Sequence, residues 1–200
     1  MDNNNNDNNN NTNIQQKVIK PNSVSFQSLG LDKEILQGIL RMGYKVPTPV
    51  QRKTLPLAFA GIDIVCMART GSGKTLAFLL PMIHKLKQHE SNTGIRAIVL
   101  SPTRELALQT FKFATDIAKF TNIRIISIVG GDGIEAQFDS LSNQPDAIIA
   151  TPGRLMHHLN EINTFTLKHV QYLVFDEADR LFEMGFAEQL NEIVKHCQLE

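Results

Sequence analysis

Apolar and polar positions along the chain follow two different periods, which together predict a layered α/β fold. Short continuous apolar runs, typical of buried strands, lie at 62–67, 95–100, 123–129, 147–150 and 172–175. Stretches whose apolar residues recur at helical spacing lie between or after these runs, at 76–86, 104–120, 134–141, 153–160 and 186–197. Apolar strands separated by helices indicate a mostly parallel sheet that is covered by helices on both faces.

Two more helices are predicted upstream of the sheet. Apolar residues recur at helical spacing over 31–42, and Gly43 is suited to end that helix. A second helix is predicted over 49–60, with Thr48 before its first turn and Gln51 at its third position, a pattern typical of a capping box. The amide of Gln51 both donates and accepts, so it could equally read the edge of an adenine ring. The spacing leaves both roles open.

The first 25 residues differ from the rest in composition. Residues 1–13 are nearly all asparagine and offer no apolar run for burial, so we predict a disordered leader. Residues 14–25 are interpreted as a linker. The expected organisation is therefore a leader and linker over 1–25, a helical segment over 26–60 and the main domain over 61–200.

Composition limits the classes of function that need to be considered. The chain has 200 residues, of which 42% are hydrophobic, and its formal net charge is zero. Contacts with a polyanion must therefore come from local arrangement and not from bulk charge. Its two cysteines lie far apart, which fits a reducing compartment. Without an apolar run of membrane length or a signal segment, we expect a soluble intracellular protein with no membrane partner.

A glycine-rich segment between a predicted strand and a predicted helix has the composition of a phosphate-binding loop. It consists of Ala68, Arg69, Thr70, Gly71, Ser72, Gly73, Lys74 and Thr75. The glycines let backbone N–H groups face an anion, Lys74 supplies a charge for the β- and γ-phosphates of a nucleotide, and the Thr75 hydroxyl is placed to bind Mg²⁺. The strict pattern begins with glycine where this chain has Ala68, and a turn that merely ends a strand is the alternative.

Two acidic residues follow the last predicted strand. Asp176 is expected to hold Mg²⁺, because a carboxylate after a strand is the usual partner of a phosphate loop. Glu177 is expected to orient and deprotonate the attacking water. The alternative is structural, with Asp176 or Asp179 capping the next helix.

Three more polar clusters follow predicted strands and are candidates for contact with a nucleic-acid backbone, because they combine hydroxyls, helix-start N–H groups and guanidinium groups. They are Pro102, Thr103 and Arg104; Gly130 and Gly131; and Thr151, Pro152, Gly153 and Arg154. Ligands of parallel sheets bind beyond the carboxyl ends of the strands, so the clusters should share one edge. The arginines could equally pair with nearby acids.

Taken in order, these motifs resemble the first RecA-like domain of the DEAD-box ATP-dependent RNA helicases. The resemblance runs from about Phe26 to Cys197 and is most specific in the phosphate loop and in Asp-Glu-Ala-Asp at 176–179. It implies that Ala68 is the usual first loop residue, that Gly43–Gln51 forms the Q motif, and that Phe26 stacks on adenine. It further implies ATP and Mg²⁺ as cofactors, sequence-independent RNA contacts for the three clusters, and a role for Asp179 in coupling to a second domain.

The sequences of 180–190 and 102–109 are most similar to those of the nucleolar branch of that family, which acts in large ribosomal subunit assembly. The resemblance thus implies a nuclear and nucleolar protein that associates with pre-ribosomal particles, and a monomer is expected.

The chain also departs from the family pattern, because it ends at Glu200 before the Ser-Ala-Thr motif and a second RecA-like domain. A missing arginine finger lowers phosphoryl-transfer rates by about 10³–10⁵, so we expect these residues alone to bind ATP weakly and to be nearly inactive. Two other hypotheses stay open: a truncated, non-catalytic module that binds nucleotide or a partner, and a different P-loop enzyme such as a DNA translocase. The acidic motif and Gln51 argue against the translocase.

Overall fold

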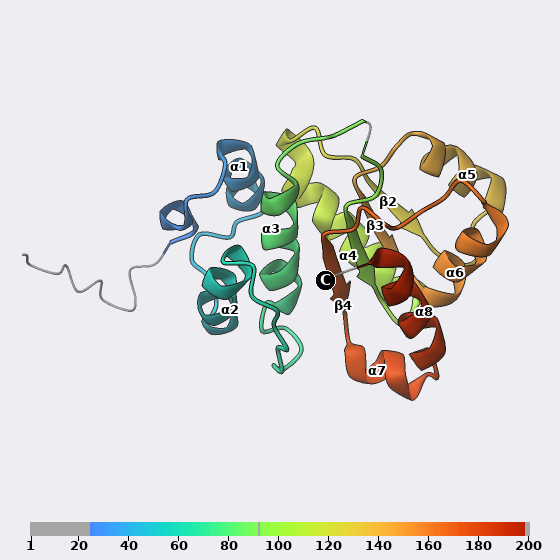
Figure 1. The fold of residues 1–200 in the computed structure, drawn as a ribbon. Helices are drawn as coiled ribbons and strands as arrows, with labels where there is room; N and C mark the ends of the chain where they lie inside the picture. The colour runs from blue at the N-terminus through green and yellow to red at the C-terminus, as the bar shows by residue number, and fades with distance from the viewer. Residues whose placement is uncertain (1–24, 92, 199–200) are drawn as a thin grey trace, which may run out of the picture.

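The computed structural model describes residues 25–91 and 93–198, so the predicted leader lies outside the described residues. Its centre is a four-stranded sheet in the order β2-β3-β1-β4, and every pairing in it is parallel (Figure 1). The strands are β1 (Ala97–Leu100), β2 (Ile125–Ile128), β3 (Ala147–Ala150) and β4 (Tyr172–Phe175). The predicted α/β fold with a parallel sheet is confirmed.

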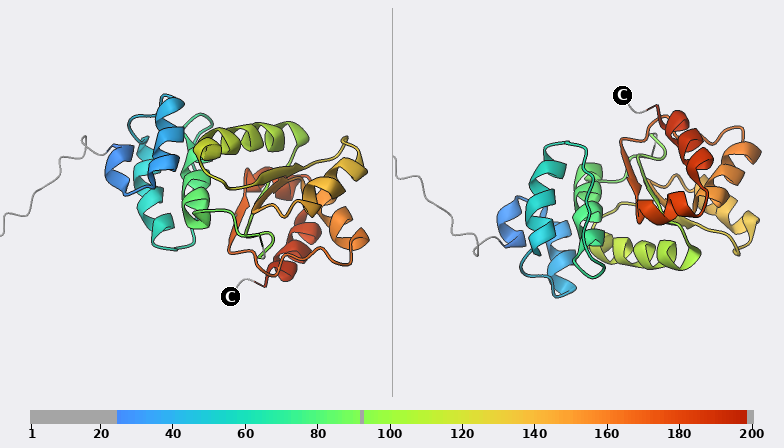
Figure 2. Two further views of the ribbon diagram at one scale, coloured as in Figure 1. Left: turned by 90° about the horizontal axis from the view of Figure 1, so that it is seen from above. Right: turned by 90° about the horizontal axis from the view of Figure 1, so that it is seen from below.

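Helices lie on both faces of this sheet, as the sequence predicted. They are η1 (Phe26–Leu29), α1 (Lys33–Arg41), α2 (Pro49–Phe59), α3 (Lys74–Leu86), α4 (Arg104–Ile117), η2 (Ala118–Phe120), α5 (Ile134–Ser142), α6 (Pro152–Glu161), α7 (Ala178–Glu183) and α8 (Ala187–Cys197). Figure 2 shows α4 on one face of the sheet and α7 and α8 on the opposite face. None of the helices in the described ranges is long and apolar enough to cross a membrane.

The period of two along each strand divides the interior into two cores. In β1, Ala97 and Val99 pack with the helices α1–α4, whereas Ile98 and Leu100 pack on the other face with α6, α7 and α8. All four side chains are fully buried. Burial of one such aliphatic side chain contributes about 1.5–3 kcal/mol, so the alternation stabilises both helical layers on the same strand.

The prediction of a strand at 62–67 is wrong. These residues form no regular structure, and Val65 and Met67 are each 95% exposed. A strand is stable only when a neighbouring strand satisfies its backbone groups, and the described residues pair β4 with β1 alone, leaving its other side as the sheet's edge. The apolar run at 62–67 has no strand partner within the described part of the chain.

A buried carboxylate connects the starts of three strands. Asp146, immediately before β3, has a fully buried side chain that accepts hydrogen bonds from Arg96 Nη2 at 2.7 Å and from the backbone N–H of Arg124 at 2.8 Å. Arg96 precedes β1, and Arg124 precedes β2. The N–H of Glu90 and the ring of His89 complete the shell of the carboxylate at 3.1 and 3.0 Å. This cluster fixes the strands relative to one another at their amino ends.

Replacing Asp146 with alanine is expected to lower the free energy of unfolding by about 3–5 kcal/mol, because it leaves the buried guanidinium of Arg96 with only the half-exposed Glu90 as an acidic partner among the described residues. Urea unfolding followed by circular dichroism measures the change. Glu192→Ala is the matched control, since Glu192 is half exposed and pairs with Lys195 at 3.4 Å on the surface. That variant should change stability by less than about 1 kcal/mol.

The effect should also depend on pH. Burial alone would raise the pKa of Asp146, but hydrogen bonds from the Arg124 backbone, from Arg96, from the Glu90 backbone and from His89 hold this pKa below its usual value. A lowered carboxyl pKa stabilises the fold above the unfolded-state pKa of about 3.9. The difference between the parent and Asp146→Ala should therefore shrink as pH falls below about 4. A difference that grows in acid would contradict this account.

Candidate functional site

The carboxyl ends of the four strands meet at one edge of the sheet. The N–H of Ser101 donates to Ala150 O at 2.9 Å, and that of Asp176 donates to Leu100 O at 2.9 Å. The N–H of Thr151 likewise donates to Ile128 O at 3.2 Å. The segments that follow the strands, at 101–104, 130–131, 151–154 and 176–177, are thus adjacent, as their positions in the sequence predicted.

The phosphate loop leads directly into helix α3, whose N-cap is Gly73. Gly71 and Gly73 have φ of +78° and +94°, a conformation that residues with a Cβ rarely adopt. Inside the loop, Lys74 Nζ donates to Ala68 O at 2.5 Å and to Arg69 O at 3.1 Å. The Ser72 hydroxyl is buried and has no hydrogen-bond partner among the described residues. An ammonium group held by the loop's own carbonyls and an unpaired buried hydroxyl fit a site for phosphate oxygens.

Gln51 uses both ends of its amide. Its Oε1 accepts from the N–H of Thr48 at 2.9 Å, which completes the predicted capping box of α2. Its Nε2 donates to Gly73 O at 2.9 Å, so the same side chain also holds the phosphate loop. A Cβ on Gly73 would lie 2.5 Å from Nε2, which shows how closely they approach. The capping role is confirmed, and contact with adenine stays a prediction.

Phe26 has a different environment from the one that the resemblance implies. Its side chain is fully buried and belongs to the core that contains α1–α4. Its N–H donates to Lys45 O at 3.3 Å, which joins the start of the described chain to the segment before α2. A fully buried ring offers no face for stacking in this structure, so the structure gives Phe26 a packing role and adenine stacking stays a prediction.

Asp176 is the buried carboxylate of the site, with 8% of its surface exposed. Burial, together with the charge of Glu177, raises the pKa of Asp176 to about 6. The N–H of Glu177, the charge of Lys74 and the hydroxyl of Thr110 act in the opposite direction but do not offset burial. A carboxylate that is costly to keep ionised is one that a cation would stabilise.

Glu177 follows in the left-handed conformation, with φ of +49° and ψ of +55°. Such a conformation is strained for a residue with a side chain, and it occurs often at functional sites. The carboxylate is 29% exposed and accepts from Arg180 Nη1 at 2.9 Å. The predicted alternative, capping of α7 by Asp176 or Asp179, is not realised, because the N-cap is Glu177 and Asp179 lies within the helix.

The donors available for Mg²⁺ are few. Within residues 25–91 and 93–198, no three His, Cys, Asp or Glu side chains are grouped as a metal site. This composition suits Mg²⁺, which is usually bound through one or two protein ligands together with substrate phosphates. Thr75 in the first turn of α3 and the buried Asp176 are the residues that would supply them, and the Mg²⁺ site stays a prediction.

Arg104 contacts a neighbouring loop. Its Nη1 donates to Gly130 O, and its Nη2 pairs with Asp132 Oδ1 at 2.7 Å. The sequence left open whether the arginine would bind phosphate or pair with an acid, and the structure shows the acid. Arg104 therefore joins two of the three candidate clusters across the sheet edge.

Some of the remaining candidate residues begin helices, and others have groups that are exposed or unpaired. Thr103 accepts from the N–H of Leu106 at 3.3 Å and thereby caps α4. Thr151 is the N-cap of α6 without such a bond, and Pro152 is buried in its first turn. Gly153 is exposed beside them. The Nη1 of Arg154 is buried and has no hydrogen-bond partner in the described part of the chain.

Two buried residues that the sequence did not single out link the second and third clusters. Gln137 Nε2 on α5 donates to Val129 O at 2.7 Å, immediately before Gly130. Its Oε1 lies 2.7 Å from Nε2 of His158 on α6, so that ring nitrogen carries the proton. Burial, and then the charges of Arg154 and His157, lower the pKa of His158. A glutamine and a histidine 21 residues apart give no local signal of this contact.

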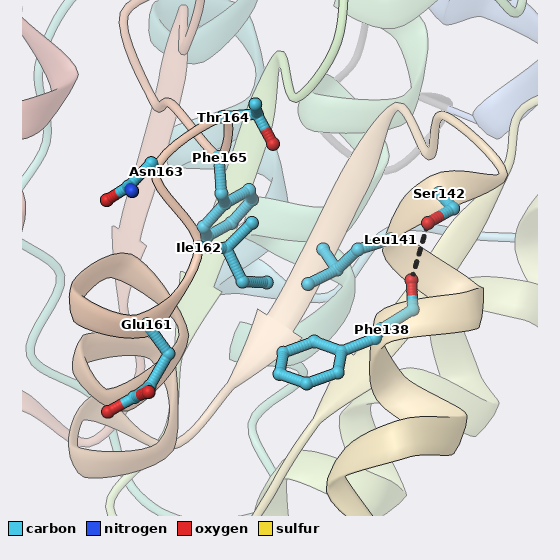
Figure 3. Close-up of a pocket in the computed structure, with 8 residues that line it drawn as sticks. All are labelled: Phe138, Leu141, Ser142, Glu161, Ile162, Asn163, Thr164 and Phe165. Atoms are coloured by element: carbon cyan, nitrogen blue, oxygen red, sulfur yellow. Dashed lines mark hydrogen bonds between the residues drawn. The ribbon is translucent and has the colours of Figure 1, made fainter.

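A hollow of about 450 Å³ lies away from this edge, between α5 and the segment after α6. Figure 3 shows its apolar lining, which includes Phe138, Leu141, Ile162 and Phe165. No candidate residue lines it. The candidate site is therefore the open sheet edge and not this hollow.

The raised pKa of Asp176 leads to a prediction about stability. Because its folded pKa of about 6 exceeds the unfolded value of about 3.9, the ionised carboxylate destabilises the fold above pH 6. Asp176→Asn should therefore increase the free energy of unfolding at pH 8 by about 1–3 kcal/mol, and the gain should shrink between pH 6 and pH 4. Urea unfolding at pH 8 and pH 5 measures it. Asp139→Asn, an exposed control, should change little, and a gain that grows in acid would contradict the assignment.

Comparison with known proteins identifies the family. The family model described as DEAD/DEAH box helicase matches residues 48–200. The chain is 61% identical over 169 residues to the ATP-dependent RNA helicase ddx54 of Dictyostelium discoideum, which covers 84% of this chain and 15% of that protein. It is 59% identical over 175 residues to the ATP-dependent RNA helicase DDX54 of Mus musculus, and the match covers 88% of this chain and 20% of that protein. The chain thus spans about a fifth or less of these relatives.

Solved structures agree with the fold. A DEAD box protein from the hyperthermophile Methanococcus jannaschii superposes with a TM-score of 0.80 at 39% identity, over 87% of this chain and 47% of that one. The α/β domain described above is accordingly of the RecA-like type found in such proteins. With a family model that matches most of its length, this chain belongs to the DEAD/DEAH box helicase family.

Proposed function

We propose that the chain is the nucleotide-binding domain of an ATP-dependent RNA helicase and supplies one part of its RNA-binding surface. The observation that carries the proposal is the position of Asp176. This buried carboxylate lies within the field of Lys74 of the phosphate loop, and its N–H bonds to the end of β1, from which the first nucleic-acid cluster continues. Nucleotide and RNA would thus bind at one edge of one rigid sheet.

Nucleotide binding is proposed because charged groups of the site now contact partners within the chain that a ligand can replace. Phosphate oxygens would replace the carbonyls of Ala68 and Arg69 around Lys74, with the N–H groups of the loop and the start of α3 adding donors. Thr75 and Asp176 would hold Mg²⁺, which neutralises charge on the phosphates. Among the described residues, the Glu177 carboxylate is held by an exposed ion pair with Arg180, so it can turn to a water molecule and accept its proton.

The RNA half rests on the three clusters that follow β1, β2 and β3. Arg104 and Arg154 offer guanidinium groups, and Thr151 begins α6 with a hydroxyl that caps nothing. Such groups fit phosphates and sugars, so the binding is expected to be independent of sequence. Pro102, Thr103, Gly130, Gly131, Pro152 and Gly153 shape the backbone that carries these groups. Asp179 on α7 would couple this edge to a second domain.

The wider role is proposed from the sequence resemblance. The family branch that resembles 102–109 and 180–190 acts in large ribosomal subunit assembly, so pre-ribosomal RNA is the proposed substrate and the nucleolus the proposed location. We propose that the nucleotide-binding unit is a monomer, since its candidate site is formed within one chain.

The proposal predicts nucleotide binding that requires Mg²⁺ and Lys74. Lys74→Ala should weaken ATP binding about 10- to 100-fold, the factor expected when a charged hydrogen-bond donor is removed. Isothermal titration calorimetry with and without Mg²⁺ measures the change. Lys112→Ala, which removes an exposed charge from α4, should leave the affinity unchanged. The same affinity in all variants, or affinity that does not depend on Mg²⁺, would rule out the proposed site.

Hydrolysis gives a second test of the proposed function. Steady-state ATPase activity should be slow for this chain, rise with single-stranded RNA if the edge binds it, and be lost in Glu177→Gln. Glu183→Gln is the matched control, because it removes an exposed carboxylate from α7, the helix that Glu177 precedes. An active Glu177→Gln variant would refute the role of Glu177 as the general base.

The two roles of Gln51 can be separated by comparing ATP with GTP. Since the structure links its amide to Gly73 O, Gln51→Ala should weaken binding of both nucleotides equally, by about 2- to 10-fold. Thr48→Ala is the control, because it weakens the cap of α2 without removing that link. A loss confined to ATP would show that the amide reads adenine.

A further inference from the structure

Arg104, a candidate RNA contact, is already bound to a carboxylate on another loop. Arg104 follows β1 and Asp132 follows β2, and β3 lies between these strands in the sheet. Their 2.7 Å ion pair therefore crosses the exit of β3, where the cluster 151–154 begins. The pair spans the surface on which an RNA backbone would have to lie.

The turn after β2, at residues 130–132, leaves room for the guanidinium group of Arg104. Gly131 has φ of +89°, and a Cβ at this position would lie 3.4 Å from Arg104 Nη1 and 3.6 Å from Cζ. The guanidinium therefore packs against the bare backbone of the turn, with Nη1 on Gly130 O and Nη2 on Asp132. Both hydrogen bonds come from one fork, the arrangement that arginine also uses for phosphate.

The pair can be exchanged at little cost. The side chains of Arg104 and Asp132 are 37% and 40% exposed, so a phosphate can reach the guanidinium from solvent. Exposed ion pairs contribute little to stability, and a carboxylate and a phosphate present the same kind of acceptor to arginine. The charge of Arg154 also acts on Asp132, so a displaced carboxylate still faces a cation.

We propose that Asp132 is an intramolecular competitor of RNA for Arg104. In the free chain its carboxylate occupies the arginine, and a phosphate of the RNA backbone takes its place on binding. Asp132 returns when the RNA leaves, and so it lowers the affinity of this edge for RNA. The inference rests on the proposed function, because it requires that Arg104 contacts RNA.

The test is the affinity for a fluorescently labelled oligouridine strand, measured by anisotropy at low salt, where phosphate contacts are strongest. Asp132→Asn keeps the size of the side chain and removes its charge. This variant should bind about 2- to 5-fold more tightly than the parent, the factor that corresponds to an exposed ion pair. Glu135→Gln is the matched control, because it removes an exposed carboxylate from the next helix that has no contact with Arg104.

A double-mutant cycle separates competition from a general effect of charge. Arg104→Gln should weaken binding, and Asp132→Asn should give no gain when it is combined with Arg104→Gln. An equal gain in that background, or the same gain from Glu135→Gln, would overturn the competition. Unfolding free energies of all variants establish that each is folded.

The outcomes also distinguish this inference from the function on which it rests. If Arg104→Gln weakens binding while Asp132→Asn leaves it unchanged or weaker, the RNA contact stands and the competition is refuted. If the parent chain and Arg104→Gln bind oligouridine equally, or neither binds it, the RNA contact of Arg104 fails and the inference fails with it.

Discussion

The geometry of the candidate site depends on a buried carboxylate at the opposite end of the sheet. Asp146 joins the approaches to β1, β2 and β3 through Arg96, the Arg124 backbone and its own position before β3. With their starts fixed, parallel strands of equal length must end at the same level. The loops that follow them are then adjacent, and contacts such as the pair of Arg104 with Asp132 add to this arrangement. The alignment of the functional edge is thus a consequence of register, and register is fixed where no ligand is expected to bind.

Two buried aspartates at opposite ends of the sheet differ in their hydrogen-bond donors and in the direction of their pKa shifts. Asp146 has two donors on each carboxylate oxygen, which overcome the cost of burial and hold its pKa below the usual value. Asp176 lies at the other end with fewer donors and with Glu177 beside it, and burial raises its pKa to about 6. The first is a complete structural ion cluster, whereas the second forms no ion pair with a described residue and has only the more distant charge of Lys74. By this difference, Asp146 is a structural residue and Asp176 is the candidate for binding a cation.

The sequence predicted the parts of the molecule that follow from local pattern. Strand and helix periods located the sheet, and Thr48, Pro49 and Gln51 located the start of α2, because these signals lie within a few residues of one another. The pattern failed at 62–67, since an apolar run becomes a strand only when it pairs, and this run pairs with no described strand although one side of β4 is an open edge. The local sequence pattern also could not predict contacts between residues that lie far apart in the chain. Neither the bond from Gln51 to Gly73 O nor the pair of Gln137 with His158 has a local signature.

Three candidate charges of the site are paired within the chain, although each is also a candidate for binding a ligand. Lys74 bonds to carbonyls of its own loop, Glu177 to Arg180, and Arg104 to Asp132. An unpaired charge near a protein surface is costly only in proportion to its burial, so these partly exposed groups accept partners that can be replaced cheaply. Ligand binding at such a site is an exchange of partners and gains only the difference between the old and new interactions. For the proposed ligands, this exchange predicts weak binding to the free domain and stronger binding when a further surface adds contacts. We therefore expect the local ion pairs, and not the sheet beneath them, to set the affinity of the proposed site.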